Sequence, residues 1–330
     1  MITRNQLVLF AALTLFTPLF ADAAPPTTAA SNKAPIQPLD RIVAIANTEI
    51  ITQTELNQKM AMVKSQLQQS NTPLPPNNVL EQQVLNNMIM ESLQLQLAKK
   101  LQINVSSSDI SNAIDHIAAS NNLSAAAMKA KIESNGMSWV NYRNEIKKEM
   151  TMAKLQQLEI SRSIHISDQE VQDIQKQYQN QQQTNQQYHL LNILIPIPDA
   201  PSPTQIEAAQ AKANTILQKL QQGANFQQMA VAESSGQEAL KGGDLDWHSL
   251  AELPTAFADQ LANKPVGSLI GPIRTGNGFH ILKIIATRAG SSAALTSDQA
   301  KQLLYRRKFE QGLGQWLQQL RSSVYVKVLL

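Results

Sequence analysis

YHLLNILI (Tyr188–Ile195) and GPIRTGNGFHILKI (Gly271–Ile284) are the two stretches that decide the fold. The first is a continuous apolar run of strand length, and the second ends in a similar run, GFHILKI. Between them lie a glycine pair before a turn, GGDLDW (Gly242–Trp247), and an LPTAF run (Leu253–Phe257). Four ordered blocks within so short a segment indicate one small compact domain.

The segments between these blocks supply the remaining elements of that domain. Apolar positions at helical spacing predict helices, and continuous apolar runs predict strands. In chain order, the expected elements are a strand over 188–195, helices over 204–222 and 226–234, a strand near Leu245, a helix over 255–261, and strands over 267–270 and 278–285. This order is typical of an α+β domain in which helices pack on an antiparallel sheet.

The sequence on either side is mainly helical. Capping boxes at Thr52–Glu55 and Ser167–Glu170 begin two helices, and Gly136 ends another. The expected helices cover 52–70, 79–101, 108–120, 124–134, 138–162, a short segment from 167, and 296–322. Because an unpaired strand edge is a liability, the terminal strands Arg41–Ala46 and Val324–Leu329 are expected to pair with each other. Both ends then complete one core, and the middle block is an insertion.

The order and spacing of the middle blocks resemble those of the parvulin family of peptidyl-prolyl isomerases. That family lines its pocket with two His, a Thr or Ser, and a Cys or Asp, so the resemblance implies polar roles for His280 and Thr275. The first family His falls on Asn192, and the Cys or Asp position falls on Gly236. His189 lies three residues before Asn192, on the opposite face of a strand. The resemblance also implies an apolar pocket floor, formed by Leu245, Leu253 and Phe257.

Two of these four polar positions depart from the family pattern. Asn can donate and accept a hydrogen bond but cannot titrate, and Gly offers only its backbone. We therefore expect weak or vestigial isomerase activity, with an active parvulin-type isomerase of secreted proteins as the alternative. Two interpretations of His280 and Thr275 stay open: a working pocket, or a pair that only satisfies its own hydrogen bonds inside a small domain.

The flanking segments resemble SurA-type periplasmic chaperones, which insert parvulin domains between an N-terminal helical module and a returning C-terminal helix and strand. The matching stretches are RIVAIANTEIITQTEL (41–56), MIMESLQLQLAKKLQINVSSSDI (88–110), NYRNEIKKEM (141–150) and RRKFEQGLGQWLQQLRSSVYVKVLL (306–330). One departure is the missing second parvulin domain, since the C-terminal helix follows Arg288 within a few residues. The resemblance implies an α+β fold with a mainly helical chaperone module and one inserted parvulin-like domain.

These observations together give the expected domain boundaries. They are 1–23 for a signal peptide, 24–39 for a flexible leader, 40–187 for the helical module with its linker, 188–288 for the parvulin-like domain, and 289–330 for the returning helix and strand. The Gln-rich stretch over 175–187 is expected to be a linker or a frayed helix end.

The first residues are typical of a secretory signal. Arg4 gives a positive n-region, Leu7–Phe20 is apolar, and Ala21–Ala23 offers a small-x-small cleavage pattern. We expect cleavage after Ala23 and a periplasmic location. A membrane-tethered foldase with an uncleaved signal is the competing interpretation. Because no Cys follows the apolar run, a lipoprotein anchor is excluded.

Composition excludes several function classes. The chain has no Cys, which removes disulfides, thiolate metal sites and Cys nucleophiles. A net charge of +3 without Lys/Arg clusters gives no nucleic-acid footprint. His116 and His165 are isolated, so no metal site is expected. The pair Gly312 and Gly314 lies inside an expected helix and is too short for a phosphate loop, and no nucleotide or other cofactor is expected.

The resemblance to SurA-type chaperones implies ATP-independent binding of unfolded outer-membrane β-barrel proteins, and it extends the expected partners to the outer-membrane assembly machinery. Eight Met residues lie between Met60 and Met152. Flexible thioethers suit a surface that accepts varied apolar sequences, although a single Met more often fills a gap between helices. The candidate client contacts are Met60, Met62, Met88 and Met90.

Overall fold

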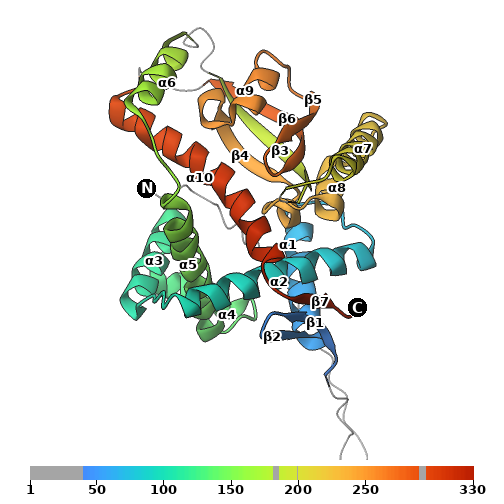
Figure 1. Cartoon of the computed structure of the whole chain (residues 1–330). Helices are drawn as coiled ribbons and strands as arrows, with labels where there is room; N and C mark the ends of the chain where they lie inside the picture. Colours follow the sequence, from blue (N-terminus) through green and yellow to red (C-terminus); the bar gives the residue numbers. More distant parts are fainter. Residues whose placement is uncertain (1–39, 181–185, 199, 290–294) are drawn as a thin grey trace, which may run out of the picture.

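The computed structural model describes residues 40–180, 186–198, 200–289 and 295–330 (Figure 1). The expected signal peptide, its cleavage after Ala23 and the leader lie outside these residues. The described residues form two parts, called here the helical module and the inserted domain. None of the helices in the described ranges combines the length and the apolar composition needed to cross a membrane.

The helical module joins the N-terminal segment to the C-terminal one. Its elements are β1 (Ile42–Ala46), β2 (Glu49–Thr52), α1 (Gln53–Gln69), α2 (Asn77–Lys100), α3 (Ser107–Ser120), α4 (Ala125–Ser134), α5 (Trp139–Ser161), α10 (Ser297–Ser322) and β7 (Val326–Val328). The expected capping box begins α1, because the Thr52 hydroxyl accepts from the Glu55 backbone and the Glu55 carboxylate accepts from the Thr52 backbone. The expected helices therefore form, each within about two residues of its predicted ends.

A three-stranded sheet closes the two ends of the chain on each other. Its order is β2-β1-β7, with β1 antiparallel to both neighbours. The pairing of β1 with β7 confirms the expected contact between the terminal strands, and Figure 1 shows β7 beside β1. The sequence did not predict β2, which forms a tight hairpin with β1 through Asn47 at φ +55. Asn tolerates this left-handed conformation better than most residues.

The inserted domain is an α+β unit with helices on both faces of its sheet. Its elements are β3 (Gln186–Pro196), α7 (Pro203–Gln221), α8 (Phe226–Glu233), η2 (Ala239–Lys241), β4 (Asp244–Ser249), η3 (Leu250–Glu252), α9 (Thr255–Leu261), β5 (Leu269–Thr275) and β6 (Gly278–Ala289). The strands are antiparallel in the order β4-β3-β6-β5. One face packs on α7 and α8 and the other on α9, as Figure 1 shows.

Helix α6 (Asp168–Asn180) leads from the module toward the inserted domain. Its capping box forms as expected, with the Ser167 backbone donating to the Glu170 carboxylate at 2.8 Å. The same carboxylate contacts the Lys308 ammonium of α10 at 2.6 Å. Helix α6 continues to Asn180, so the first part of the Gln-rich stretch 175–187 is helical, as the frayed-helix interpretation of that stretch expects.

The two parts are packed together rather than separated by a free linker. Val231 of α8 is fully buried in the core of the helical module, among residues of β1, α1 and α2. The Gln83 side chain donates to the Ala232 carbonyl at 2.9 Å, and the Gln228 side chain donates to the Leu74 carbonyl at 3.0 Å. Helix α10 also lies between the two parts in Figure 1. The inserted domain is therefore held against the module by several elements.

Candidate functional site

The predicted polar residues lie on neighbouring strands at the centre of the inserted sheet. His280 of β6 is paired with Leu194 of β3, and Asn192 lies two residues before Leu194. Side chains two residues apart on a strand share a face, so Asn192 and His280 form a diagonal pair. The Asn192 Oδ1 atom lies 3.0 Å from the His280 Nδ1 atom. This contact brings together the first two of the four predicted polar positions.

The other ring nitrogen faces the turn between β5 and β6. His280 Nε2 lies 3.1 Å from the Thr275 hydroxyl and 3.0 Å from the Asn277 Oδ1 atom. The Thr275 hydroxyl itself donates to the Asn277 side chain and to the Gly278 carbonyl. The imidazole is thus held on both sides by neutral polar groups. We call His280, Asn192, Thr275 and Asn277 the polar ring.

Burial keeps this imidazole neutral. His280 is only 6% exposed, and burial lowers its pKa from 6.5 to about 4. A neutral ring has one N–H donor and one acceptor nitrogen. Asn192 and Asn277 present their Oδ1 atoms to opposite ring nitrogens. An amide oxygen only accepts and a neutral ring has one N–H to donate, so one of the two amides must turn its NH₂ group toward the ring to complete the pair. The two amides together therefore set which tautomer His280 adopts.

The predicted apolar floor forms beside the polar ring. Leu253 and Phe257 are buried in one cluster on the α9 side of the sheet, and Leu245 packs against it. The Phe257 ring meets the His280 ring edge to face, with 4.8 Å between centroids. An aromatic wall beside a buried neutral imidazole gives an apolar site with a few polar groups.

Gly236 does not join the polar ring. A Cβ atom at this position would lie 3.3 Å from the Ser234 hydroxyl and 3.7 Å from the Leu194 Cβ atom. Ser234 is 1% exposed, and its hydroxyl accepts from the backbone of Leu194 and of Gly236. The position that carries a Cys or Asp in parvulins therefore offers only backbone here, beside a serine hydroxyl that accepts two backbone hydrogen bonds.

His189 takes no part in the pocket. Its Nε2 atom lies 2.7 Å from the Asp244 carboxylate, and its ring packs 5.2 Å from the Trp247 ring. The Arg288 guanidinium lies over that same indole at 4.3 Å. This group is distinct from the polar ring, so His189 cannot replace the histidine that Asn192 displaces.

Asn277 is the pocket residue that sequence reasoning missed. Its signal lay in the string TGNG, because Asn between glycines is typical of a turn whose side chain bonds locally. The pairing register of β5 and β6 places this turn next to His280. Asn277 lies three residues before His280, and its side chain contacts the imidazole.

The four predicted methionine contacts do not form one exposed surface. Met60 is 7% exposed and packs inside the core of the helical module, so its assignment as a client contact is wrong. Met88 and Met90 are half-buried against the same core. Met62, at 45% exposure, is the one of the four that reaches solvent. The other three fill space between helices, as unbranched thioethers commonly do.

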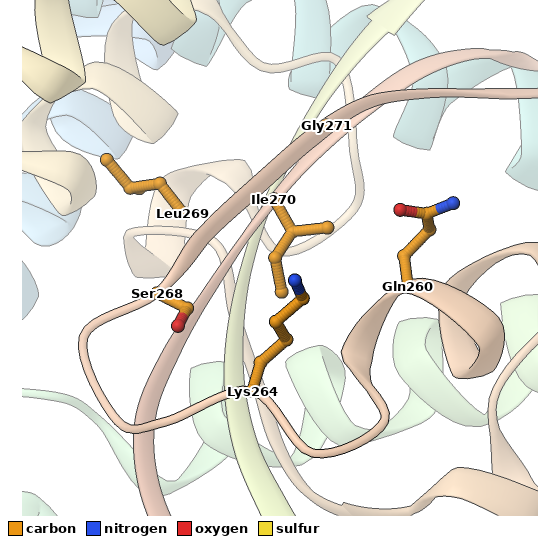
Figure 2. Close-up of a pocket in the computed structure, with 6 residues that line it drawn as sticks. All are labelled: Gln260, Lys264, Ser268, Leu269, Ile270 and Gly271. Carbon is orange, nitrogen blue, oxygen red and sulfur yellow. The ribbon is translucent and has the colours of Figure 1, made fainter.

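A hollow of about 320 Å³ lies between α9 and β5 (Figure 2). Its lining residues are Gln260, Lys264, Ser268, Leu269, Ile270 and Gly271. None of the predicted site residues lines it. Within the described ranges, no three His, Cys, Asp or Glu side chains gather in a way that could bind a metal ion.

Comparison with protein families divides the chain in the same way. Residues 39–156 match the family described as "SurA N-terminal domain". Residues 192–286 match the family described as "PPIC-type PPIASE domain". The second match contains all four members of the polar ring.

Curated relatives carry both parts. The "Chaperone SurA" of Legionella pneumophila (strain Paris) is 40% identical over 250 residues, which cover 76% of this chain and 58% of that protein. The "Chaperone SurA" of Nitrosococcus oceani is 39% identical over 269 residues, covering 81% and 63%. The chain thus spans less than two thirds of the length of these relatives.

Solved structures show weaker likenesses. A crystal structure of a PpiC-type peptidyl-prolyl cis-trans isomerase domain is 33% identical, covers 32% of this chain and 95% of that one, and has a TM-score of 0.30. A SurA-like chaperone structure from Campylobacter jejuni is 20% identical, covers 88% and 100%, and has a TM-score of 0.39.

Proposed function

The chain joins a SurA-type N-terminal domain to a single PPIC-type rotamase domain, and on this premise we propose that it is an ATP-independent periplasmic chaperone for unfolded outer-membrane β-barrel proteins. Clients would be held on the helical module and passed to the outer-membrane assembly machinery. The rotamase domain would contribute prolyl binding and weak isomerase activity. Its boundaries are proposed as 188–288, between a module over 40–187 and a returning segment over 289–330.

The proposed binding of clients by the helical module is supported by the location of its exposed apolar side chains. Among the described residues, every large hydrophobic side chain that is clearly exposed, except Val266, lies in the helical module or its C-terminal strand. These residues are Ile42, Ile50, Met62, Leu101, Val140, Leu158, Tyr325, Val328, Leu329 and Leu330. They are scattered over several elements, which favours many weak contacts with extended chains of varied sequence.

The pocket supports the second part of the proposal. Rotation about an X–Pro bond is slow because the amide must leave its planar, conjugated state. An apolar floor at Phe257 and neighbouring leucines would desolvate the proline. The polar ring would offer hydrogen bonds that favour the twisted carbonyl or nitrogen over the planar amide. Turnover should be low, because Asn192 cannot titrate and Gly236 offers only its backbone, unlike the residues of the parvulin pattern.

An active isomerase of secreted proteins is the second candidate function. The observation that favours it is the intact contact between His280, Thr275 and Asn277, in a ring that is neutral at pH 7. A neutral buried imidazole can donate or accept a hydrogen bond without the cost of removing a charge from water. A prolyl-peptide assay with the full chain decides between low and high turnover.

Point substitutions in the full chain test the holding role. Deleting the inserted domain is a poorer test, because it removes Val231 from the core of the module. The double variant Met62→Glu, Val140→Glu places charges at two exposed apolar positions of the module. It should weaken binding of an unfolded outer-membrane β-barrel protein about twofold, on the order of 0.5 kcal/mol, and so raise light scattering from that protein at equal chaperone concentration.

The matched control is Val266→Glu, at the exposed apolar residue of the inserted domain. This control should suppress aggregation as well as the unchanged chain. Equal loss in both variants would show that charge alone disturbs binding, and no loss in either would contradict a client surface on the module.

A further inference from the structure

Helix α10 of the module lies directly on the turn that completes the prolyl pocket. The Gln318 side chain donates to the backbone carbonyl of Asn277 at 2.9 Å. Ile197 of the inserted domain donates to the same carbonyl at 3.2 Å. One of the two groups that hold the backbone of Asn277 therefore comes from outside the domain that carries the pocket.

Two glycines make room for this approach. A Cβ atom added to Gly314 would lie 2.6 Å from the Asn277 Nδ2 atom, and one added to Gly276 would lie 2.5 Å from the Gln315 Nε2 atom. Gly in a helix interior costs about 1 kcal/mol relative to Ala. The glycine at 314 thus weakens α10 locally, while its missing side chain leaves the space that the Asn277 amide occupies.

These contacts form one face of α10. Residues 314, 315 and 318 span a single helical turn, and positions four apart lie above one another on a helix. Gly312, by contrast, faces Ile160 of α5, where a Cβ atom would lie 3.1 Å from the Cγ2 atom. The two glycines of the motif therefore serve different contacts, one within the module and one on the pocket turn.

We propose that Gln318 is a positioning residue of the prolyl pocket: it holds Asn277, whose side chain holds the imidazole of His280. The pocket is then complete only while the inserted domain lies on α10. A client that displaces α10 from the turn would release Asn277 and loosen the hydrogen bond on His280 Nε2. This inference rests on the proposed prolyl-binding role, but the state of the imidazole can be measured without any isomerase turnover.

The test compares two pairs of variants in the full chain labelled with ¹⁵N-histidine. Gln318→Met keeps the length of the side chain and removes its donor, and Gln319→Met makes the same change at the exposed neighbour. Gly314→Ala pushes on the Asn277 amide, and Gly312→Ala is its control. Both alanine variants remove a glycine from the helix interior and gain a similar helix propensity. They differ in the residue they press on, which is Asn277 of the pocket turn for Gly314→Ala and Ile160 of α5 for Gly312→Ala.

The expected result is a change in the ring-nitrogen resonances of His280, and so in its tautomer balance, in Gln318→Met and Gly314→Ala only. The His280 signal is assigned by its loss in His280→Gln. Where prolyl-peptide turnover is measurable, the same two variants should lower kcat/KM about threefold to tenfold, the effect of one hydrogen bond.

The proposal is overturned if the His280 resonances in Gln318→Met and Gly314→Ala match those of the two controls. If the chain shows no prolyl-peptide turnover, the proposed isomerase role is wrong. The NMR test of the His280 imidazole still decides whether Gln318 positions Asn277. Should Gln318→Met fail to fold, Gly314→Ala alone decides, because it acts on Asn277 from the same helix face.

Discussion

The helical module and the inserted domain treat apolar side chains in opposite ways. In the module, residues such as Met62 and Val140 reach solvent at 45% and 66% exposure. In the inserted domain, Leu253 and Phe257 are at most 5% exposed, and the Phe257 ring packs against the buried imidazole of His280. Broad holding of unfolded chains needs exposed, dispersed contacts, whereas work on a single peptide bond needs a closed and ordered pocket. The contrast supports the proposal that the two tasks belong to different parts of one packed molecule.

The largest expected effect tests whether the inserted domain can lose stability while the helical module stays folded. Leu261→Ala removes a fully buried side chain of α9 and should destabilise the inserted domain by about 2–5 kcal/mol. Amide hydrogen exchange resolved by peptide should speed up in β6 but not in α3 and α4, which have their own small core. Equal acceleration in α3 and α4 would show that the parts unfold as one unit, and the contrast would weaken.

The next largest expected effect is a pH dependence of the stability of the inserted domain, caused by His280. The pKa of His280 is about 4 in the folded chain and 6.5 as a reference, because burial disfavours the charged ring. Between these values the unfolded chain binds a proton that the folded chain does not, so stability should fall as pH drops from about 6.5 to 4. The loss is on the order of 3 kcal/mol.

The variant His280→Gln checks this assignment, because glutamine does not titrate. Exchange in β6, measured from pH 7 to pH 4, should lose its steep acid sensitivity in the variant and keep it in the unchanged chain. A slope that survives the substitution would mean that other groups, and not the pocket imidazole, set the acid limit of the inserted domain.

A smaller expected effect tests whether Asn192 and Gly236 are the reason for the proposed weak isomerase activity. The double variant Asn192→His, Gly236→Asp restores the residue types of the parvulin pattern at both departed positions. One added charge-assisted hydrogen bond would raise kcat/KM for a prolyl peptide about tenfold. The added side chain at 236 must fit beside the Ser234 hydroxyl, so each single variant is measured as well. An unchanged rate would mean that these two positions do not limit turnover.

Local sequence signals predicted most of the fold. The capping box at Thr52 fixed the start of α1, and the apolar run of β1 with the alternation near Val326 predicted the closing sheet. The helix over 255–261 matches α9 at both ends. Caps, turns and apolar periods are written into neighbouring residues, so they can be read without the tertiary structure.

The misses share a physical cause. The strand β2 is four residues long, which is too short for a clear alternation of apolar and polar residues, and its pairing with β1 defines it. Met60 and Met62 differ by two positions, and only the orientation of α1 on the core makes the first buried and the second exposed. Asn277 entered the polar ring through the register of β5 and β6. Each of these depends on contacts between residues that are distant in the chain or on opposite sides of an element.

The most direct test of the account is site-specific photo-crosslinking to an unfolded outer-membrane β-barrel protein. A photoreactive residue is placed, one at a time, at Met62, Val140 and Val266 of the full chain, three exposed apolar positions. The account predicts strong crosslinks from Met62 and Val140 and weak ones from Val266. Crosslinks that concentrate at Val266, with none from the module, would contradict the claim that the helical module holds the client.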